Sequence, residues 1–501
     1  MNEEKIIVEP LLLRGFRDYL PAQVNARQNM IAIIKGVYER YGFVPLETPA
    51  LEYLTTLVGY GEDGSKQIFR LKNPEKEDIA LRFDLTVPLA RVIAQYPELP
   101  KPFRRFQVGP VWRADKPDPG RFREFYQFDL DTVGCESMSA DTEIICGMYD
   151  TLLALGITRF QVRFSDRKIL NVLLEFAGIP LERGHDVFRV LDKIEKIGLA
   201  NVEKELSTGR VDASGDKIKG IGLQTVQIDK IKEFLSLPSS IKIKENEKLR
   251  AESPDSEWSV SRMDVIADLK VLFREIPSSG EAIGELEEIS TYLDALDIPQ
   301  DKVVLDLSIA RGLDYYTGPV FESFLLDLKE YGSVFSGGRY DGLVERFLGK
   351  KIPATGASVG VDRLFAAMQK LNLIEMTPAT AQVIVTVMER SRMLDYQKIT
   401  RELRLANIKT ELYLGTENSL SKQLQYANEQ KIPVAVIIGG DEFAKNEVTI
   451  KDLKLGAQLQ EKKIAGAFKD RDEWLRESRK AQVSVPKDGC IEKIKEVLAS
   501  H

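Results

Sequence analysis

The sequence predicts a mixed α and β protein with a large N-terminal part and a smaller C-terminal α/β domain. Strand-like stretches prevail in residues 1–174 and return in 299–372, whereas 175–298 is charged, helical and poor in strand signal. From residue 381 onward, β-branched runs alternate with helical segments, which is typical of a largely parallel sheet. We therefore predict one domain over 1–174 and 299–372 that is divided by a helical insertion over 175–298, a second domain over 381–480, and a tail over 481–501.

The composition is that of a globular protein, with 43% hydrophobic and 29% charged side chains in 501 residues. No run approaches the ~18 uninterrupted apolar residues of a membrane span, and the charged start MNEEKIIVEP does not match a secretory signal. Three cysteines are too few for a disulfide framework. We therefore expect a cytoplasmic protein without membrane contact.

Histidine is scarce, because His185 and His501 are the only two in the chain. This scarcity excludes a histidine-rich zinc site. A Ser-His-Asp or Cys-His arrangement would have to use His185, which lies in a polar stretch and is expected to be solvated or near a helix cap. His501 is the last residue and is expected to fray. Chemistry must therefore depend on arginines, carboxylates, tyrosines and backbone amides.

The net charge of −7 excludes a uniformly basic nucleic-acid binder. The charge is uneven, however, because residues from Ala381 to the end carry 21 basic and 18 acidic side chains, a net charge of +3. This asymmetry is compatible with a polyanionic partner at the C-terminal part.

Residues 1–174 are predicted to form a defined series of helices and strands. Residues 21–41 have apolar side chains at helical spacing. The extended segment GFVPLETPALE, with two prolines, suits an edge strand or an interface. IALRFDLTVPLARVIAQ predicts a strand running into a helix, with Asp84 and Thr86 at the junction. Two further strands, FRRFQVGPVWRA and FREFYQFDLDTV, are joined by the turn-forming loop DKPDPGR.

The remaining segments continue the alternation. SLPSSIKIKENEKLRAESPDSEWS, within the helical insertion, is rich in breakers and predicts an exposed connection. Strands return in VVLDLSIA, YYTGPVFESFLLDL and SVFSGGRYDGLV, and ATGASVGVDRLFAAMQKL predicts a strand followed by a helix. The C-terminal domain contributes the strands AQVIVTVM, IKTELYL, PVAVIIG and EVTIKDL.

The predicted hairpin carries the first candidate site. Residues Lys101 to Phe125 have a net charge of +4, although the chain is acidic. Arginine forks bind phosphate oxygens bidentately, and an aromatic ring between them can stack on a base. A solvated outer strand face explains the pattern equally well. The residues concerned are Arg104, Arg105, Arg113, Arg121 and Arg123, with Phe125, Gln127, Asp129 and Asp131 alternating with Arg123 onto one strand face.

Two further clusters could carry chemistry. In Ser308–Gly318, glycines flank the pair Tyr315–Tyr316, and Arg311 supplies a charge. Tyrosine hydroxyls with a carboxylate can hold an amine or an imidazole ring, although composition alone favours a hairpin whose tyrosines pack the core. Asp362 and Arg363 open a predicted helix, where a helix N-terminus and an arginine suit an anion, or form a simple surface pair.

In their order, these motifs resemble the histidyl-tRNA synthetase family of the class II aminoacyl-tRNA synthetases. YGFVPLETPALE is similar to motif 1, VWRADKPDPGRFREFYQFDLD to motif 2, and GASVGVDRL to motif 3. RGLDYYTGPVFE and SGGRYDGLV are similar to the two peptides that distinguish the histidine enzymes. The resemblance implies an α+β class II catalytic domain, an antiparallel sheet flanked by helices with a helical insertion, followed by a C-terminal α/β anticodon-binding domain.

The resemblance also implies an activity and its participants. The chain would activate L-histidine with ATP to histidyl-adenylate and transfer it to the 3′ end of tRNA(His), releasing AMP and diphosphate. ATP would be used with Mg²⁺, no zinc would be bound by the protein, and motif 1 would form a homodimer. No general base is needed, because the ionised substrate carboxylate attacks the α-phosphorus in line.

Individual roles follow by the same resemblance. Arg113 and Arg311 would be catalytic, on opposite sides of the α-phosphate, where other class II enzymes rely on a metal ion. ATP would be bound by Arg113, Arg121, Phe125 and Arg363. Histidine would be bound by Asp84, Leu85, Thr86, Arg113, Gln127, Asp131, Arg311, Tyr315 and Tyr316. The acceptor end of tRNA would contact the loop 114–120, which includes Lys116. The anticodon would contact Lys422, Gln423 and Tyr426. For each of these three residues, a place on an ordinary amphipathic helix is an equal explanation.

Two other classes of protein compete with this hypothesis. A synthetase-like regulatory subunit of ATP phosphoribosyltransferase shares the catalytic fold but lacks the anticodon domain and usually loses catalytic residues. The chain retains Arg113, Gln127, Arg311 and Arg363 and has a βαβα C-terminal part, which favours the ligase. An RNA-binding or signalling module would not need an intact amino-acid pocket.

Overall fold

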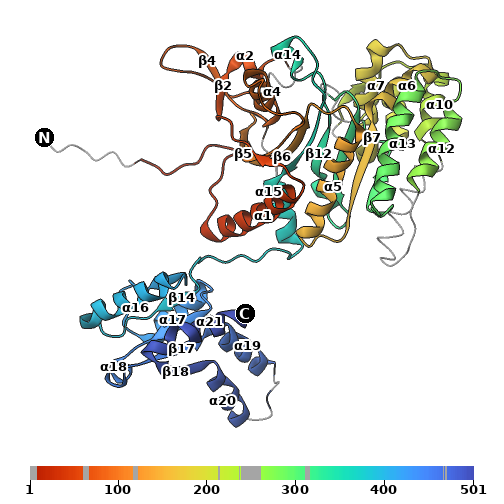
Figure 1. Cartoon of the computed structure of the whole chain (residues 1–501). Helices are drawn as coiled ribbons and strands as arrows, with labels where there is room; N and C mark the ends of the chain where they lie inside the picture. Colours follow the sequence, from red (N-terminus) through yellow and green to blue (C-terminus); the bar gives the residue numbers. More distant parts are fainter. Residues whose placement is uncertain are drawn as a thin grey trace. The chain divides into compact units, whose positions relative to one another are not determined.

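A computed structural model describes residues 8–59, 67–116, 122–212, 215–235, 237, 261–310, 316–465, 468 and 471–501. The chain divides into two compact units (Figure 1). Unit 1 comprises Met1–Arg17 and Met30–Ile374, and unit 2 comprises Asp18–Asn29 and Glu375–His501. Almost all of the predicted exposed connection, at 236 and 238–259, lies outside the described residues.

An eight-stranded sheet forms the centre of unit 1 (Figure 1). Its inner strands pair antiparallel, and a short strand pairs parallel at each edge, which confirms the predicted antiparallel-rich catalytic fold. The predicted edge strand in GFVPLETPALE is one of these edges. In spatial order the strands are β1 (Val44–Pro45), β5 (Phe103–Trp112), β6 (Glu124–Val133), β13 (Ala354–Gly360), β12 (Ser333–Arg339), β11 (Pro319–Leu325), β7 (Phe160–Asp166) and β10 (Val303–Leu305).

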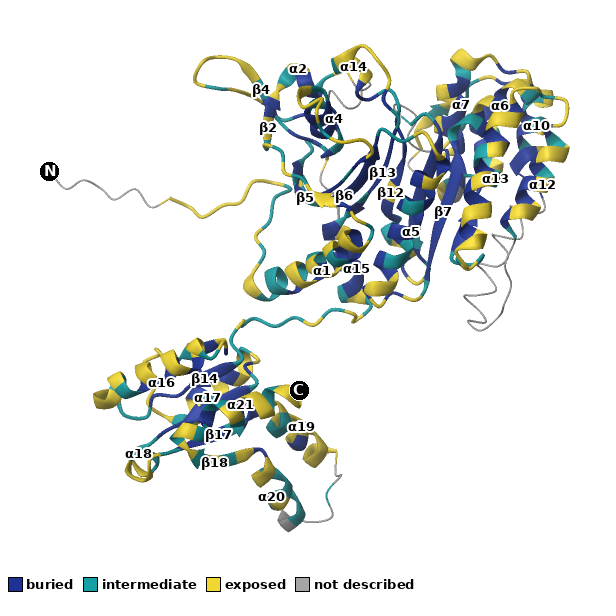
Figure 2. Ribbon diagram, in the orientation of Figure 1, coloured by how far each residue is buried: buried dark blue, intermediate teal, exposed yellow. Residues whose placement is uncertain are grey.

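The two faces of this sheet differ in chemistry. On the apolar face, the Tyr38 ring of α1 (Pro21–Arg40) meets Phe128 edge-on at a centroid distance of 5.0 Å. Two more helices, α5 (Met138–Ala154) and α15 (Val361–Lys370), pack on β13 and β6. The central strands of the sheet are largely buried (Figure 2). On the opposite face, the register aligns polar residues of β5, β6, β13 and β12.

A three-stranded sheet places the Asp84 region beside β5. It consists of β2 (Leu51–Tyr53), β4 (Asp78–Leu81) and β3 (Arg70–Lys72), with helices α2 (Leu54–Leu57) and α4 (Thr86–Gln95). Arg82 follows β4 and donates from Nε to the Pro110 carbonyl at 3.0 Å. A Cβ at Gly109 would lie 2.7 Å from Arg82 Nη2, so a larger residue there would displace the Arg82 guanidinium. The predicted transition from strand to helix at Asp84 is confirmed.

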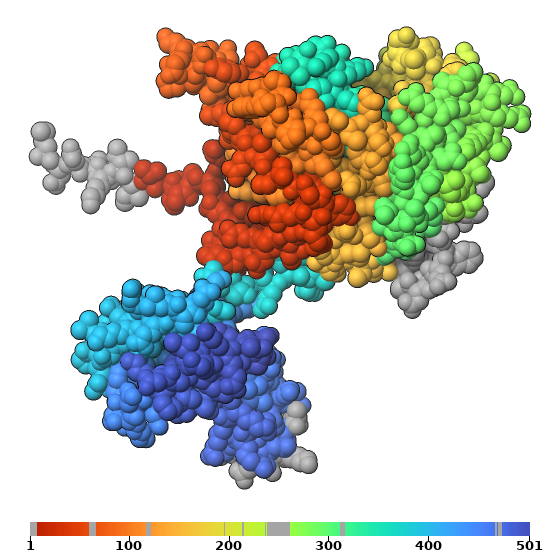
Figure 3. All heavy atoms as spheres, viewed as in Figure 1, coloured from red at the N-terminus to blue at the C-terminus, as the bar shows by residue number. Residues whose placement is uncertain are grey.

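The insertion is mainly helical, as predicted, and forms one end of the surface of unit 1 (Figure 3). It also contains a two-stranded sheet that the sequence did not suggest, β8 (Gly209–Val211) with β9 (Lys217–Lys219). His185 lies exposed on α7. The helices are α6 (Arg167–Ala177), η1 (Leu181–Arg183), α7 (Gly184–Leu191), α8 (Ile194–Ile197), α9 (Leu199–Leu206), α10 (Thr225–Leu235), α12 (Arg262–Leu272) and α13 (Ser279–Ala295), and η2 (Lys329–Tyr331) and α14 (Glu345–Leu348) follow in the second catalytic part.

Unit 2 has a five-stranded mixed sheet rather than the predicted largely parallel one. Three strands, β15 (Thr410–Leu412), β14 (Val383–Val385) and β16 (Val434–Ile437), pair in parallel. The next two, β17 (Glu447–Asp452) and β18 (Gln482–Pro486), continue antiparallel. Its helices are η3 (Arg390–Arg392), α16 (Met393–Leu405), α17 (Leu420–Glu429), α18 (Gly440–Lys445), α19 (Leu453–Ile464), α20 (Arg471–Lys480), η4 (Lys487–Gly489) and α21 (Cys490–Ala499).

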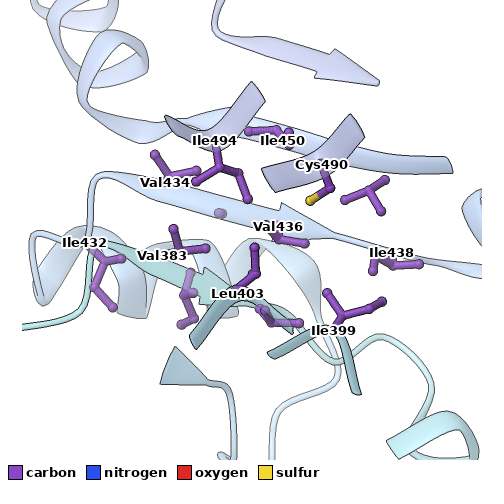
Figure 4. Close-up of a cluster of buried hydrophobic side chains, with 14 of the residues drawn as sticks. Val383, Ile399, Leu403, Ile432, Val434, Val436, Ile438, Ile450, Cys490 and Ile494 are labelled. Carbon is purple, nitrogen blue, oxygen red and sulfur yellow. The ribbon is translucent and has the colours of Figure 1, made fainter. Parts of the chain in front are cut away.

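The predicted tail is part of this domain, so the predicted boundary at residue 480 is wrong. Strand β18 pairs along β17, and Cys490 and Ile494 of α21 point into the hydrophobic core (Figure 4). The chain end is also docked rather than frayed. His501 Nε2 lies 3.0 Å from Asp452 Oδ2, and Lys454 Nζ donates to the His501 carbonyl at 3.0 Å.

Truncation of Ile494 tests this correction. Ile494 is fully buried, so Ile494→Ala is expected to destabilise unit 2 by about 2–5 kcal/mol. Amide hydrogen exchange of β16 and β17 in the full chain measures the change. Lys495→Ala, at the next and exposed position, is the matched control and should change stability by less than about 0.5 kcal/mol. Unchanged protection of β17 in Ile494→Ala would contradict the assignment.

All three cysteines, Cys135, Cys146 and Cys490, are free thiols. Among the helices that the structure describes, none is both long and apolar enough to cross a membrane.

Candidate active site

A cavity of about 180 Å³ opens on the polar face of the unit 1 sheet. Residues at the ends of β5 and β6 form one side, namely Arg113, Asp115, Phe122, Phe125 and Gln127. Serine and glycine residues of β12 and β13 form the floor, and the start of α15 contributes Asp362 and Arg363. The floor residues Ser333, Ser336 and Ser358 were not singled out from the sequence, although the small-residue runs SGG and GASVG were a signal for a hollow here.

Arg113 and Phe125 form a cation–aromatic pair in the cavity wall. The Arg113 guanidinium carbon lies 5.1 Å from the Phe125 ring centroid. Its Nε donates to the Phe83 carbonyl at 3.0 Å, and its backbone N donates to the Arg123 carbonyl at 2.8 Å. The guanidinium is therefore held at a fixed place beside a flat apolar ring.

The start of α15 supplies the second cation. Arg363 Nη1 donates to the Ser333 carbonyl at 2.7 Å, and the residue is exposed. The preceding Asp362 accepts the Tyr126 backbone N at 2.7 Å, which ties α15 to β6. One cavity thus combines two arginines with an aromatic ring, the side-chain types that bind phosphates and stack on a base.

Asp84 lies beside this cavity, two residues before α4 begins at Thr86. Its Oδ1 accepts the Val87 backbone N at 3.0 Å. Burial raises the pKa of the Asp84 carboxyl to about 6, although Arg113 and Arg105 oppose the rise. Leu85 is buried and its carbonyl accepts from Arg105, while Thr86 begins α4 half-buried.

A buried charge cluster underlies the site. Arg105 is fully buried and lies 2.8 Å from Asp131 Oδ2 and 3.6 Å from Asp129 Oδ2. Tyr340 donates its hydroxyl to Asp131. Burial raises the pKa of Asp129 to about 7, against the opposing effect of Arg105. Both carboxylates are 2% exposed, so the alternative of a solvated outer strand face is wrong.

Asp131 does not line the cavity, because its carboxylate is engaged by Arg105 and Tyr340. Gly356 faces it from β13, and a Cβ there would overlap Asp131 Oδ1. Gln127 does line the cavity and donates from Nε2 to Ser358 Oγ at 3.0 Å. The polar face of the sheet therefore has two regions. Gln127 and Phe125 line the cavity, whereas Asp129 and Asp131 are buried and do not line it.

The tyrosine pair is only partly within the described residues. The half-buried Tyr316 ring lies against Gly338, where a Cβ would be 3.0 Å from Tyr316 Cδ1. Tyr315, Arg311 and Arg121 lie outside the described residues, so their roles remain predictions. In the described part of the chain, no three His, Cys, Asp or Glu side chains are grouped so that they could hold a metal ion.

The predicted RNA contacts divide into exposed and buried residues. Lys116 is exposed, and so is Lys422, which pairs with Glu417 at 3.2 Å. Gln423 is fully buried, accepts from the Val387 backbone N and donates to its carbonyl, both at 2.8 Å. The expectation that Gln423 faces RNA is therefore wrong, because its amide ties α17 to the segment after β14.

Unit 2 also carries a groove that sequence analysis missed. The groove has a volume of about 940 Å³ and is lined by Arg401 and Arg404 of α16 and by Glu411 and Tyr413 at β15. Tyr426 lines it as well and donates its hydroxyl to Glu411 at 2.8 Å. The two arginines one helical turn apart, just before the strand IKTELYL, were the available signal.

An antiparallel sheet that carries a cation–aromatic cavity, combined with a separate mixed α/β domain, agrees with the fold of a class II aminoacyl-tRNA synthetase. Comparisons with known proteins narrow this class. The model of the histidyl-tRNA synthetase family matches residues 15–364, and an anticodon binding domain model matches 382–471. This chain belongs to the histidyl-tRNA synthetase family.

Individual relatives agree with this assignment. A histidine–tRNA ligase of Ruegeria sp. strain TM1040 is 42% identical over 97% of this chain and 96% of the relative. The ligase of Ruegeria pomeroyi is 43% identical over 97% of each chain. The crystal structure of histidyl-tRNA synthetase from Nostoc sp. PCC 7120 has a TM-score of 0.77 at 30% identity, covering 98% of this chain and 100% of that one.

A Bacillus halodurans structure described as an ATP phosphoribosyltransferase regulatory subunit/histidyl-tRNA synthetase also shares the fold. It is 23% identical with a TM-score of 0.65 and covers 84% of this chain. At this identity the likeness concerns the fold alone. The match of an anticodon binding domain and the more similar ligases favour the ligase over the regulatory subunit.

Proposed function

We propose that this chain is a histidine–tRNA ligase. It activates L-histidine with ATP to histidyl-adenylate and then transfers the histidyl group to the 3′ end of tRNA(His). The observation that carries the proposal is the single cavity in which Arg113, Phe125 and Arg363 meet, beside the carboxylate of Asp84. The chain's place in the histidyl-tRNA synthetase family supports the choice of amino acid.

The site chemistry suits adenylate formation. A histidine carboxylate oxygen attacks the α-phosphorus, a new O–P bond forms, and the bond to the β-phosphate oxygen breaks, so that diphosphate leaves. Arg113 stabilises the charge that develops on the α-phosphoryl oxygens, and Phe125 stacks on adenine. In this proposal Asp84, Thr86 and Gln127 bind the amino and carboxylate groups of histidine, and Tyr315 and Tyr316 line the imidazole pocket. Arg311 opposes Arg113, and Arg121 and Arg363 meet the outer phosphates.

ATP is used as its magnesium complex in this proposal. Magnesium prefers oxygen ligands and often binds through substrate phosphates with one or two carboxylates. Asp115 and Asp362 are the carboxylates among the cavity-lining residues, and Asp362 already binds the Tyr126 backbone N. These two carboxylates therefore suit a Mg²⁺ ion that enters the site bound to the phosphates of ATP.

The proposed partners are tRNA(His) and a second copy of the chain, in the cytoplasm. The catalytic domain comprises 1–174 and 299–372 with 175–298 inserted, and the anticodon-binding domain extends to residue 501. The exposed motif 1 residues Val44, on β1, and Leu51, on β2, support a dimer interface at this segment. Lys116 is assigned to the acceptor end and Lys422 to the anticodon side.

The decisive experiment is amino-acid-dependent exchange of diphosphate into ATP, with each of the twenty amino acids and without tRNA. Exchange with histidine alone, followed by charging of tRNA(His), is the expected result. Histidine binding without exchange would instead indicate the regulatory subunit. Exchange with another amino acid would overturn the assignment of the tyrosine pocket.

The raised pKa of Asp84 predicts a specific pH dependence. An ionised carboxylate binds the substrate ammonium group, and the pKa of Asp84 is about 6. The ratio of kcat/KM for histidine between wild type and Asp84→Asn should therefore rise with pH through 6 and level off above about 7. Ionisation of the substrate cancels in this ratio. A ratio that stays flat from about pH 5 to 8 would remove Asp84 from histidine recognition.

A further inference from the structure

The segment that precedes α1 is hydrogen-bonded to the end of the β5–β6 hairpin, which forms one side of the cavity. Arg123 donates its backbone N to the Gly15 carbonyl at 2.8 Å and its Nη1 to the Arg14 carbonyl at 3.3 Å. The Phe16 ring meets Phe69 edge-on at 6.2 Å. The segment from Arg14 to Arg17, here the N-terminal arm, is thus fixed to the end of the β5–β6 hairpin and to the three-stranded sheet.

Arg17 connects the two walls of the cavity. Its guanidinium carbon lies 3.8 Å from the centroid of the Phe122 ring, and its Nη2 lies 3.5 Å from Asp362 Oδ1. Phe122 ends the hairpin loop, Asp362 is the second residue of α15, and both line the cavity. The side chain of Asp362 is 7% exposed and that of Arg17 is 30% exposed, so the pair is partly shielded from water.

The contacts of Asp362 transmit this link to the site. Its other oxygen accepts the Tyr126 backbone N next to Phe125, and the following residue is Arg363. The position of Asp362 therefore sets the distance between the strand that carries the aromatic ring and the helix that carries the second cation. Arg17 holds this carboxylate from outside the cavity, and it also holds Phe122 in the facing wall.

We propose that Arg17 is a positioning residue for ATP, which clamps the hairpin end at Phe122 to the start of α15 at Asp362. Arg17 is not among the cavity-lining residues, so it acts through Phe122, Asp362 and Arg363 rather than by touching the reacting atoms. The inference rests on the proposed function, because it assigns ATP to this cavity.

Arg17→Ala tests the clamp in histidine-dependent diphosphate exchange. The KM for ATP is expected to rise about tenfold, because an ion pair and a cation–aromatic contact at the cavity walls are both lost. The KM for histidine is expected to stay within about twofold of wild type, since Asp84 is untouched. Arg17→Lys retains the charge and should recover part of the ATP affinity, which a general packing defect would not do.

Arg14→Ala is the matched control, because Arg14 is exposed and contacts Arg123 through its backbone carbonyl. It is expected to leave both KM values unchanged. The proposal is overturned if Arg17→Ala leaves the KM for ATP unchanged, if both KM values rise together, or if Arg14→Ala has the same effect. Calorimetric titration with a non-hydrolysable ATP analogue repeats the comparison without turnover. If the wild type binds the analogue but catalyses no exchange, and Arg17→Ala loses this binding, only the proposed function is overturned.

Discussion

Arg113→Ala is expected to lower kcat for histidine-dependent diphosphate exchange by about 10²–10³-fold, the loss typical of one preorganised donor to a developing oxyanion. Arg113 is held in a fixed position, because its Nε and its backbone N donate to the Phe83 and Arg123 carbonyls and its guanidinium lies beside Phe125. A fixed guanidinium needs little reorganisation as charge develops on the α-phosphoryl oxygens. Its removal should therefore reduce kcat more than the binding of either substrate.

The matched control for this prediction is Arg104→Ala near the start of β5, the strand that Arg113 directly follows. Arg104 pairs with Glu143 and lies over the Phe43 ring, and it is not among the residues that line the cavity. Its removal should leave kcat within about twofold of wild type. Arg113→Lys retains the charge but loses the fork, so it should recover only part of the rate. A loss of less than about tenfold in Arg113→Ala would show that another group carries the transition-state charge.

Arg105→Met is expected to destabilise unit 1 by about 3–5 kcal/mol at pH 8, the cost of leaving a buried charge without its partner. Arg105 is the cation that faces both Asp129 and Asp131, and all three side chains are almost completely buried. Methionine fills similar space without a charge. The two carboxylates would then remain ionised in an apolar interior or would have to take up a proton.

The pH dependence of this loss distinguishes electrostatics from packing. Without Arg105 the folded-state pKa of Asp129 rises above its present value of about 7, while the unfolded value is ordinary. A carboxyl with a raised folded-state pKa favours folding at low pH and loses that contribution as pH increases. The destabilisation should therefore be smaller at pH 5.5 than at pH 8. Urea unfolding of the full chain at both values measures it, and a loss independent of pH would indicate a packing defect instead.

Sequence patterns predicted the local geometry of the site well and its burial poorly. Alternation in FREFYQFDLD placed Phe125, Gln127, Asp129 and Asp131 on one strand face, as found. Whether that face was solvated depended on β13 and β12, which follow more than 190 residues later along the chain. Strand pairing over this distance does not affect the local sequence pattern. Only the structure therefore distinguishes the cavity-lining residues of this face from its buried residues.

The wrong predictions in unit 2 also arise from contacts between segments that are distant in the sequence. Gln423 is a polar residue on a predicted helix, and its residue type suggested an exposed position, but its amide is buried and satisfies the backbone groups of Val387. The strand in QVSVP is short and weakly apolar, and its pairing with β17 rather than its composition makes it a strand. The resemblance supplied roles for Arg121, Arg311 and Tyr315 that residue chemistry alone could not assign.

The strand order of unit 1 also has a consequence for synthesis on the ribosome. Strand β6 ends at Val133, but its neighbour β13 begins at Ala354, 221 residues later. At about 5–20 residues per second, translation leaves this strand edge without its partner for roughly 10–45 s. During that time the nascent chain presents an open row of backbone donors and acceptors, a template for unwanted pairing. Folding in the cell therefore has to shield the catalytic strand until the second half of the sheet has been translated.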